Sequence, residues 1–170
     1  MNKLKEYIND HPDFPKEGIL FRDLSPILAK PKIFSELIEQ MSSSSIIKKA
    51  DALVSIDARG FIFGSAIALK TLKPMIIARK PGKLPGKLSE SSYTLEYAKN
   101  SLSIQTYAVK GFKTFAIIDD LLATGGTVDC VKKILKSLNK EVSGISVVVE
   151  LKDLNARSNI NCPIDSQVVY

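Results

Sequence analysis

The sequence predicts an α/β fold with a largely parallel central sheet and helices on both of its faces. Short apolar runs alternate along the chain with segments of helical periodicity, which is typical of strand–helix–strand units with right-handed crossovers. These runs are continuously apolar, as expected for strands buried on both faces. With 170 residues, 45% of them hydrophobic, the chain can bury one sizeable core, so we expect a single domain over residues 1–170.

The elements follow in order from the N-terminus. A short helix is expected over residues 4–8, before a stretch rich in proline and glycine. Pro31 favours the first turn of a second helix, in which apolar residues recur at helical spacing, namely Phe34, Leu37, Ile38 and Met41. Serines at 42–45 end this helix. Beyond them we expect a buried helix over residues 61–69 and strands over residues 53–56, 75–78, 102–106 and 145–149.

The most informative segment joins a strand at 115–118 to a helix at 128–138 through a loop that contains two glycines. Residues 124–127 of this loop present successive backbone N–H groups, and the glycines permit positive φ and close approach of an anion. The N-terminus of the following helix adds partial positive charge. The loop therefore favours a phosphate group, although it lacks the Gly-Lys-Ser/Thr ending of a Walker loop.

Two carboxylates, Asp119 and Asp120, come directly between the strand and this loop. Ionised carboxylates only accept hydrogen bonds, and the vicinal hydroxyls of a ribose are matching donors. The segment thus fits a sugar phosphate. The simpler alternative is a solvated Asp-Asp turn followed by a tight loop.

A second loop, residues 55–61, also follows a buried strand and precedes a helix. In parallel sheets such loops share the rim at the carboxyl ends of the strands, where ligands bind. Arg59 offers a fork of donors suited to phosphate oxygens, and Gly60 leaves the helix N-terminus accessible. A surface ion pair is the alternative for Arg59. Residues 79–96, with lysines, glycines and prolines, predict a mobile basic lid or simply an exposed flexible loop.

Composition narrows the class of partner. The net charge is +6, but the lysines are dispersed and no aromatic-basic interleaving appears, so we expect a polyanionic small molecule and no nucleic acid. No apolar run approaches the roughly 20 residues of a membrane span, and residues 1–10 show no secretory signal. Two cysteines form no disulfide framework, so a cytoplasmic setting is expected. His11 has no metal-ligand cluster around it.

Five stretches together resemble the type I phosphoribosyltransferase family, and in particular its adenine-specific members. They are FPKEGILFRDLSP at 14–26, DARGF at 57–61, RKPGKLPG at 79–86, YTLEYA at 93–98 and FAIIDDLLATGGT at 115–127. The resemblance implies the type I phosphoribosyltransferase fold, with a small N-terminal hood over about residues 1–30 and a flexible lid over about residues 79–97. It implies transfer of the phosphoribosyl group from phosphoribosyl pyrophosphate (PRPP) to adenine, giving AMP and pyrophosphate. The alternatives are another purine base or a noncatalytic PRPP-sensing regulator.

The resemblance also implies the residues that bind PRPP. Asp119 and Asp120 would bind the ribose hydroxyls, and Arg59 would face pyrophosphate with Lys80 and Lys83. The 5'-phosphate would bind at the loop formed by Ala123, Thr124, Gly125, Gly126 and Thr127. A cis peptide is expected at Asp57-Ala58, as in other family members.

For the base and the reaction, the resemblance implies a hood site and two further catalytic residues beside Arg59. Glu96 would manage the proton on the purine, and Tyr97 would close over the reacting centre. Backbone groups of Leu20 and Phe21 would read the Watson-Crick edge of adenine, although Phe21 also suits plain core packing. Arg22 would order the hood, or reach the ligand or a partner subunit.

Magnesium is expected through PRPP and water, with no direct protein ligand, and family members are generally homodimers. The chain departs from the family where Ala98 and Ala156 replace glycines.

Overall fold

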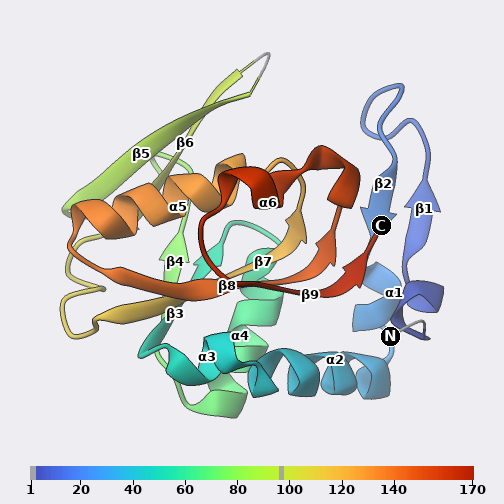
Figure 1. Ribbon diagram of the computed structural model, residues 1–170, viewed down its shortest axis with the longest axis horizontal. Helices are drawn as coiled ribbons and strands as arrows, with labels where there is room; N and C mark the ends of the chain where they lie inside the picture. The colour runs from blue at the N-terminus through green and yellow to red at the C-terminus, as the bar shows by residue number, and fades with distance from the viewer. Residues whose placement is uncertain (1–2, 96–97) are drawn as a thin grey trace.

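The computed structural model describes residues 3–95 and 98–170. Its centre is a five-stranded sheet in the order β4-β3-β7-β8-β9, with every neighbouring pair parallel. The strands are β3 (Ala52–Ile56), β4 (Met75–Ala78), β7 (Thr114–Leu122), β8 (Glu141–Glu150) and β9 (Ile164–Val169). The predicted fold class is confirmed, because the sheet is parallel and lies between helices (Figure 1).

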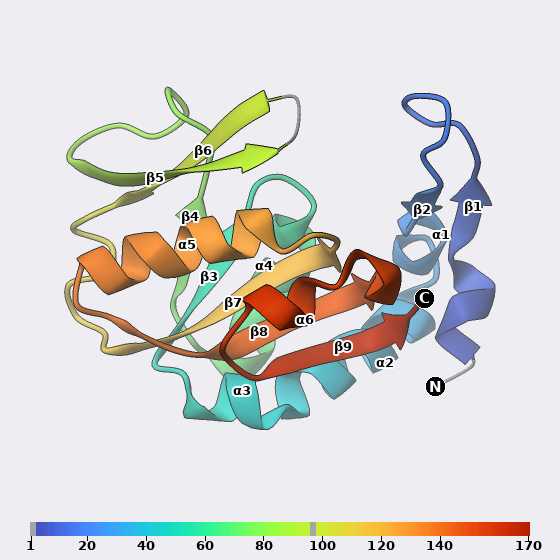
Figure 2. The same ribbon diagram turned by 45° about the horizontal axis from the view of Figure 1, so that its top comes forward.

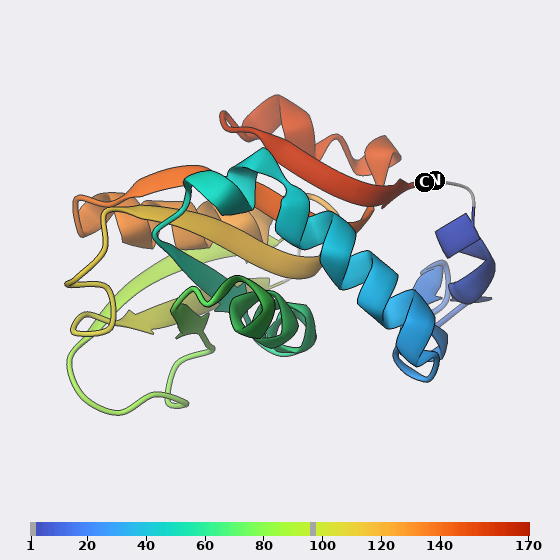
Figure 3. The same cartoon turned by 90° about the horizontal axis from the view of Figure 1, so that it is seen from below.

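Helices cover the two faces of the sheet unequally. One face carries α2 (Pro31–Ser43), α3 (Ser45–Lys49) and α4 (Gly60–Thr71), and the other carries α5 (Gly126–Ser137), as the view from below makes plain (Figure 3). Two short helices, α1 (Ser25–Leu28) and α6 (Ala156–Asn159), and two 3-10 turns, η1 (Lys3–Tyr7) and η2 (Lys152–Leu154), complete the helical elements.

Local sequence explains the helix boundaries. Pro31 occupies the first turn of α2, where its missing N–H costs nothing. The side chain of Ser44 accepts a hydrogen bond from the backbone N–H of Ile46 and so caps α3. The predicted break at 42–45 is therefore narrower than expected: Ser42 and Ser43 still belong to α2, and only Ser44 separates the two helices.

The central strands are buried on both sides, which accounts for their continuous apolarity. In β7, Phe115 and Ile117 join the hydrophobic cluster beneath α5, whereas Ala116 and Ile118 join the cluster beneath α2, α3 and α4. All four are 0% exposed. The sheet is thus fixed in position by two cores, and the loops at its carboxyl edge stand on a rigid base.

Two hairpins lie outside the main sheet. In the hood, β1 (Asn9–His11) pairs antiparallel with β2 (Phe21–Asp23). The second hairpin joins β5 (Leu88–Leu95) to β6 (Ala98–Gln105) and packs on α5, where the Cys130 thiol donates to the Ser91 carbonyl at 3.1 Å. Figure 2 shows the hood beyond the carboxyl ends of β7, β8 and β9.

Several elements differ from the sequence prediction. The expected helix at 4–8 is the 3-10 turn η1, and β7 and β8 are longer than their apolar runs. Strands β1, β2, β5 and β9 were not predicted. No helix forms in residues 79–95, as expected, but residues 88–95 are a paired strand rather than open loop. In the described parts of the chain, no helix has the length and apolar character to cross a membrane.

Candidate functional site

The strand-loop-helix segment forms one side of a hollow at the carboxyl edge of the sheet. Strand β7 continues through both carboxylates to Leu122, and α5 begins at Gly126. Between them Gly125 has φ +86, a left-handed conformation that glycine adopts without strain. The hollow measures about 210 Å³ and is lined by Arg59 and by every residue from 120 to 128. The structure therefore brings the predicted phosphate loop, Asp120 and Arg59 together.

The two carboxylates have different environments. Asp119 is 8% exposed, and its Oδ1 accepts a hydrogen bond from the Asp120 backbone N–H at 2.9 Å. Burial, reinforced by the neighbouring charge of Asp120, raises the pKa of Asp119 well above its ordinary value. The hydrogen bond from the Asp120 N–H and the charge of Arg59 only partly oppose this shift. Asp120 instead pairs directly with Arg59, with 2.6 Å between Oδ2 and Nη2. A donor-rich ligand such as a sugar diol suits this pair of acceptors.

The second loop meets the first through a glycine. A Cβ atom on Gly60 would lie 2.9 Å from Asp119 Oδ1 and 3.1 Å from the Ile118 carbonyl oxygen, so only glycine permits this approach. The hydroxyl of Ser55 donates to the Gly60 carbonyl at 3.0 Å and fixes the start of α4. The peptide bond between Asp57 and Ala58 is cis, which confirms that prediction.

Arg59 also connects the rim of the sheet to the hood. Its guanidinium carbon lies 4.9 Å from the centre of the Phe21 ring, within cation-π range. Phe21 in turn packs edge-on against Phe14, with 5.2 Å between ring centres. A hollow of about 430 Å³ adjoins these rings and is lined by residues 11–14, Phe21 and Asp23. Phe21 thus faces the predicted site.

The other hood residues lie differently. The Arg22 guanidinium stacks on the Tyr170 ring at 3.7 Å and forms an ion pair with Asp10. These contacts join the hood to the C-terminal residue, and the predicted role of Arg22 in ordering the hood stays a prediction. Leu20 is 45% exposed, so part of its surface is accessible to a ligand.

The lid segment contributes a residue that the sequence did not single out. Arg79 donates from Nε to Asp57 Oδ2 at 2.9 Å and lies 5.8 Å from the Phe61 ring centre. It ties the start of the lid to the second loop, and its place directly after a buried strand was the available signal. Lys80 and Lys83 are exposed. Glu96 and Tyr97 lie outside the described residues.

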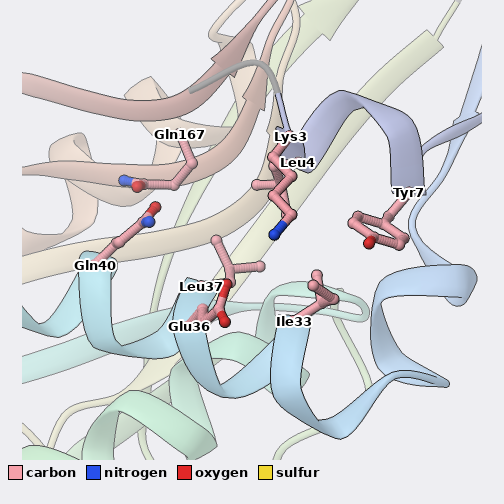
Figure 4. A pocket seen from close by; sticks show the side chains of 8 residues that line it. All are labelled: Lys3, Leu4, Tyr7, Ile33, Glu36, Leu37, Gln40 and Gln167. Carbon is pink, nitrogen blue, oxygen red and sulfur yellow. The ribbon is translucent and has the colours of Figure 1, made fainter.

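The remaining candidate ligand sites are a metal cluster and a second hollow. Within residues 3–95 and 98–170, no group of three or more His, Cys, Asp or Glu side chains could hold a metal ion. A separate hollow of about 170 Å³ lies between η1, α2 and β9 (Figure 4). None of the residues that line it belongs to the predicted site.

Comparisons with known proteins agree with this geometry. The sequence model of the phosphoribosyl transferase domain family matches residues 24–162. Adenine phosphoribosyltransferase of Prochlorococcus marinus strain MIT 9215 is 63% identical over 169 residues, which cover 99% of this chain and 98% of the relative. The protein of that name from Mycoplasmopsis agalactiae is 46% identical over 158 residues, covering 93% and 92%.

Solved structures give the same result. The crystal structure of adenine phosphoribosyltransferase from Thermoanaerobacter pseudethanolicus superposes with a TM-score of 0.94 at 37% identity, covering 99% of both chains. The Saccharomyces cerevisiae enzyme, crystallised with an imino-altritol bisphosphate and adenine, gives a TM-score of 0.86 at 32% identity, covering 98% of this chain and 97% of that one.

Proposed function

This chain belongs to the phosphoribosyl transferase family, and from that premise we propose that it transfers the 5-phosphoribosyl group of PRPP to adenine, giving AMP and pyrophosphate. The observation that carries the proposal is the single hollow in which Arg59, Asp120 and the phosphate loop meet. Its donors and acceptors are of the kinds that the phosphate and ribose groups of PRPP need. The relatives of high identity are adenine phosphoribosyltransferases.

Each part of PRPP has a matching group. The backbone N–H groups of residues 123–127 suit the 5'-phosphate at the start of α5. Asp119 and Asp120 accept hydrogen bonds from the ribose hydroxyls. Pyrophosphate oxygens compete with Asp120 for the guanidinium N–H groups of Arg59. The exposed Lys80 and Lys83 add positive charge from the lid.

Adenine binds under the hood, where Phe21 packs against the base. A backbone carbonyl of Leu20 or Phe21 accepts from the exocyclic amine, and a backbone N–H donates to N1. Hypoxanthine and guanine present the reverse pattern on that edge, so buried groups would lose their partners. Arg22 holds the hood in place through Asp10 and Tyr170.

In the reaction, the C–O bond to pyrophosphate breaks with its electron pair leaving on oxygen, and adenine N9 bonds to the ribose carbon. The N9 proton passes to Glu96, and Tyr97 closes over the centre; both roles rest on the resemblance of the segment at 93–98. Closure excludes water, which would otherwise trap the oxocarbenium-like state.

PRPP would bring magnesium into the site, and the ion would need no direct protein ligand. The site offers two adjacent carboxylates, one of them paired with Arg59, and this donor set suits ribose hydroxyls and a metal held by substrate oxygens and water. When bound, the ion would supply neutralisation of the charge on the leaving pyrophosphate.

The active form is a homodimer. Helix α4 exposes the apolar side chains of Ile62 at 39% and Leu69 at 78%, and Leu72, which directly follows the helix, is 88% exposed. A helix that is apolar all round is normally buried, so a second copy of the chain is the expected cover. Cys130 and Cys162 are free thiols, which suits the reducing cytoplasm in which we place the enzyme.

The test measures pyrophosphate release from PRPP and magnesium, with adenine, hypoxanthine, guanine and xanthine offered in parallel. Adenine alone should support turnover, and Glu96→Gln should lower it by about 100-fold or more. Turnover confined to another base would overturn the base assignment. PRPP binding without turnover would favour a regulator.

A further inference from the structure

The phosphate loop rests against a wall that is contributed by the C-terminal part of the chain. A Cβ atom on Gly125 would lie 2.8 Å from Ile160 Cδ1 and 3.3 Å from Ala156 Cβ. Both residues are buried, at 6% and 3% exposure, and belong to the same hydrophobic cluster as Val128 and Val131 of α5. The position of α6 therefore determines where the backbone of the loop can lie.

One ion pair holds α6 in that position. Arg157, next to Ala156, donates from Nε to Glu150 Oε1 at 2.6 Å and from Nη2 to Oε2 at 2.7 Å. Glu150 ends β8 and its side chain is only 4% exposed, and the hydroxyl of Ser166 on β9 donates to the same carboxylate. The hydrogen bonds from Arg157 are the main reason that the pKa of Glu150 lies below its ordinary value.

The pair is also joined to the loop through the backbone. Leu151 directly follows Glu150, and its N–H donates to the Leu122 carbonyl at 2.9 Å. Leu122 is the last residue of β7 before the phosphate loop. The carboxyl end of β8 thus meets the loop at two points: the backbone of Leu151 contacts its entry, and the Glu150 side chain reaches Gly125 through Arg157 and α6.

We propose that Arg157 and Glu150 are positioning residues for the 5'-phosphate: their bidentate pair holds α6 against Gly125 and so presets the amides of the loop. The inference rests on the proposed function. Neither side chain lines the phosphate hollow, so the effect passes through α6. Loss of the pair loosens the loop and weakens phosphate binding, while the pyrophosphate side of the site, at Arg59, is untouched.

The experiment compares the binding of two ligands by calorimetry. Ribose 5-phosphate probes the loop, and magnesium pyrophosphate probes the Arg59 side. For Arg157→Met we expect about tenfold weaker binding of ribose 5-phosphate, because small displacements of a preset site are costly. Pyrophosphate affinity should stay within about twofold, the KM for PRPP should rise, and kcat at saturating PRPP should be retained, which is the signature of lost uniform binding.

Further variants separate positioning from folding. Arg157→Met leaves a buried carboxylate unpaired, which is destabilising, whereas Glu150→Gln combined with Arg157→Met removes that charge and should show the same selective loss. Arg157→Lys keeps one hydrogen bond to Glu150, so its affinity for ribose 5-phosphate should lie between those of the native chain and Arg157→Met. The matched control is Lys113→Met, which removes the exposed pair with Glu141 at the opposite ends of β7 and β8 and should bind both ligands as the native chain does.

Unchanged binding of ribose 5-phosphate by Arg157→Met and by the double variant would overturn the inference. An equal loss of affinity for both ligands would also overturn it, because that result indicates general destabilisation of the protein. If the native chain, measured first, binds neither ligand, the proposed function fails and this inference fails with it.

Discussion

The guanidinium of Arg59 bridges two parts of the molecule that are far apart in sequence, with Nη2 lying 2.6 Å from Asp120 Oδ2. On its other side it faces the Phe21 ring at 4.9 Å. The Arg59 side chain is 37% exposed, whereas that of Asp120 is 9% exposed. On the proposed function, the cation would exchange the carboxylate of Asp120 for incoming phosphate oxygens while it stays between the hood and the sheet.

Replacing Arg59 should lower kcat/KM for PRPP. We expect about a 100-fold loss for Arg59→Met, because a fork of charge-assisted donors to the leaving group disappears, and a smaller loss for Arg59→Lys. Steady-state kinetics with varied PRPP would measure it. The control is Lys113→Met, which removes the exposed pair with Glu141. An Arg59→Met enzyme with native kcat/KM would refute the role.

Asp119 should strengthen ligand binding while it lowers the folding stability of the unliganded protein. Its raised pKa means that the folded state binds the proton more tightly than the unfolded state, so stability falls as pH rises from the ordinary aspartate pKa through the raised one. Asp119→Asn keeps an acceptor for the Asp120 N–H without the charge. We expect the melting temperature of the unliganded variant to exceed native by a few degrees at neutral pH.

That gain should shrink as the pH falls through the ordinary aspartate pKa and vanish well below it, where the native carboxyl is protonated in both the folded and the unfolded states. Turnover of PRPP by Asp119→Asn should drop about tenfold or more, because a weaker acceptor faces the ribose hydroxyls. Thermal melts across pH, run beside the turnover assay, would measure both effects. A variant less stable than native at neutral pH would contradict the prediction.

Gly60 should tolerate no side chain, because a Cβ there would meet Asp119 Oδ1 and the Ile118 carbonyl oxygen. We expect Gly60→Ala to cost about 1–3 kcal/mol of unfolding free energy and to raise the KM for PRPP. Gly111→Ala is the matched control, since a Cβ at Gly111 meets no atom within 4 Å; it should stay within about 0.5 kcal/mol of native. Urea titration would measure the unfolding free energy of both variants. Equal losses in Gly60→Ala and Gly111→Ala would show that the close approach at Gly60 does not require glycine.

Light scattering on the native chain should give twice the 18.7 kDa of one chain. Leu69→Glu places a charge on the exposed apolar side of α4 and should shift the protein to the monomer, since an unpaired charge in an apolar interface is costly. Leu154→Glu, at another exposed leucine, should leave the mass unchanged. A native monomer, or a dimer that survives Leu69→Glu, would exclude α4 as the interface.

The sequence predicted the strands whose signal is continuous apolarity, such as β3 and the first half of β7. It could not predict β9, because Ile164–Val169 mixes polar and apolar residues, or β5, which is largely polar and is defined by its pairing with β6. The second half of β7 was not predicted for a related reason. Asp119 and Asp120 continue the strand, although aspartate is rare in β-strands.

Much of the candidate site followed from one rule, that loops after parallel strands share a rim. That rule brings Arg59 near Asp120, but it cannot say that they pair, nor that Arg79 reaches Asp57. The sequence could not predict the contact of Gly125 with Ile160 either. It joins residues on separate elements and depends on how tightly α6 packs, for which a single sequence has no local signal.

The hood hairpin β1–β2 shares no strand pairing with the five-stranded sheet, although its Phe21 reaches Arg59 on the rim. On the proposed assignment, the base is selected by residues 9–23, while the ribosyl donor is handled by loops anchored in β3 and β7. Evolution can therefore exchange the nucleobase preference by remodelling one short peripheral hairpin. The machinery for activated ribose, fixed between two cores, would be inherited intact.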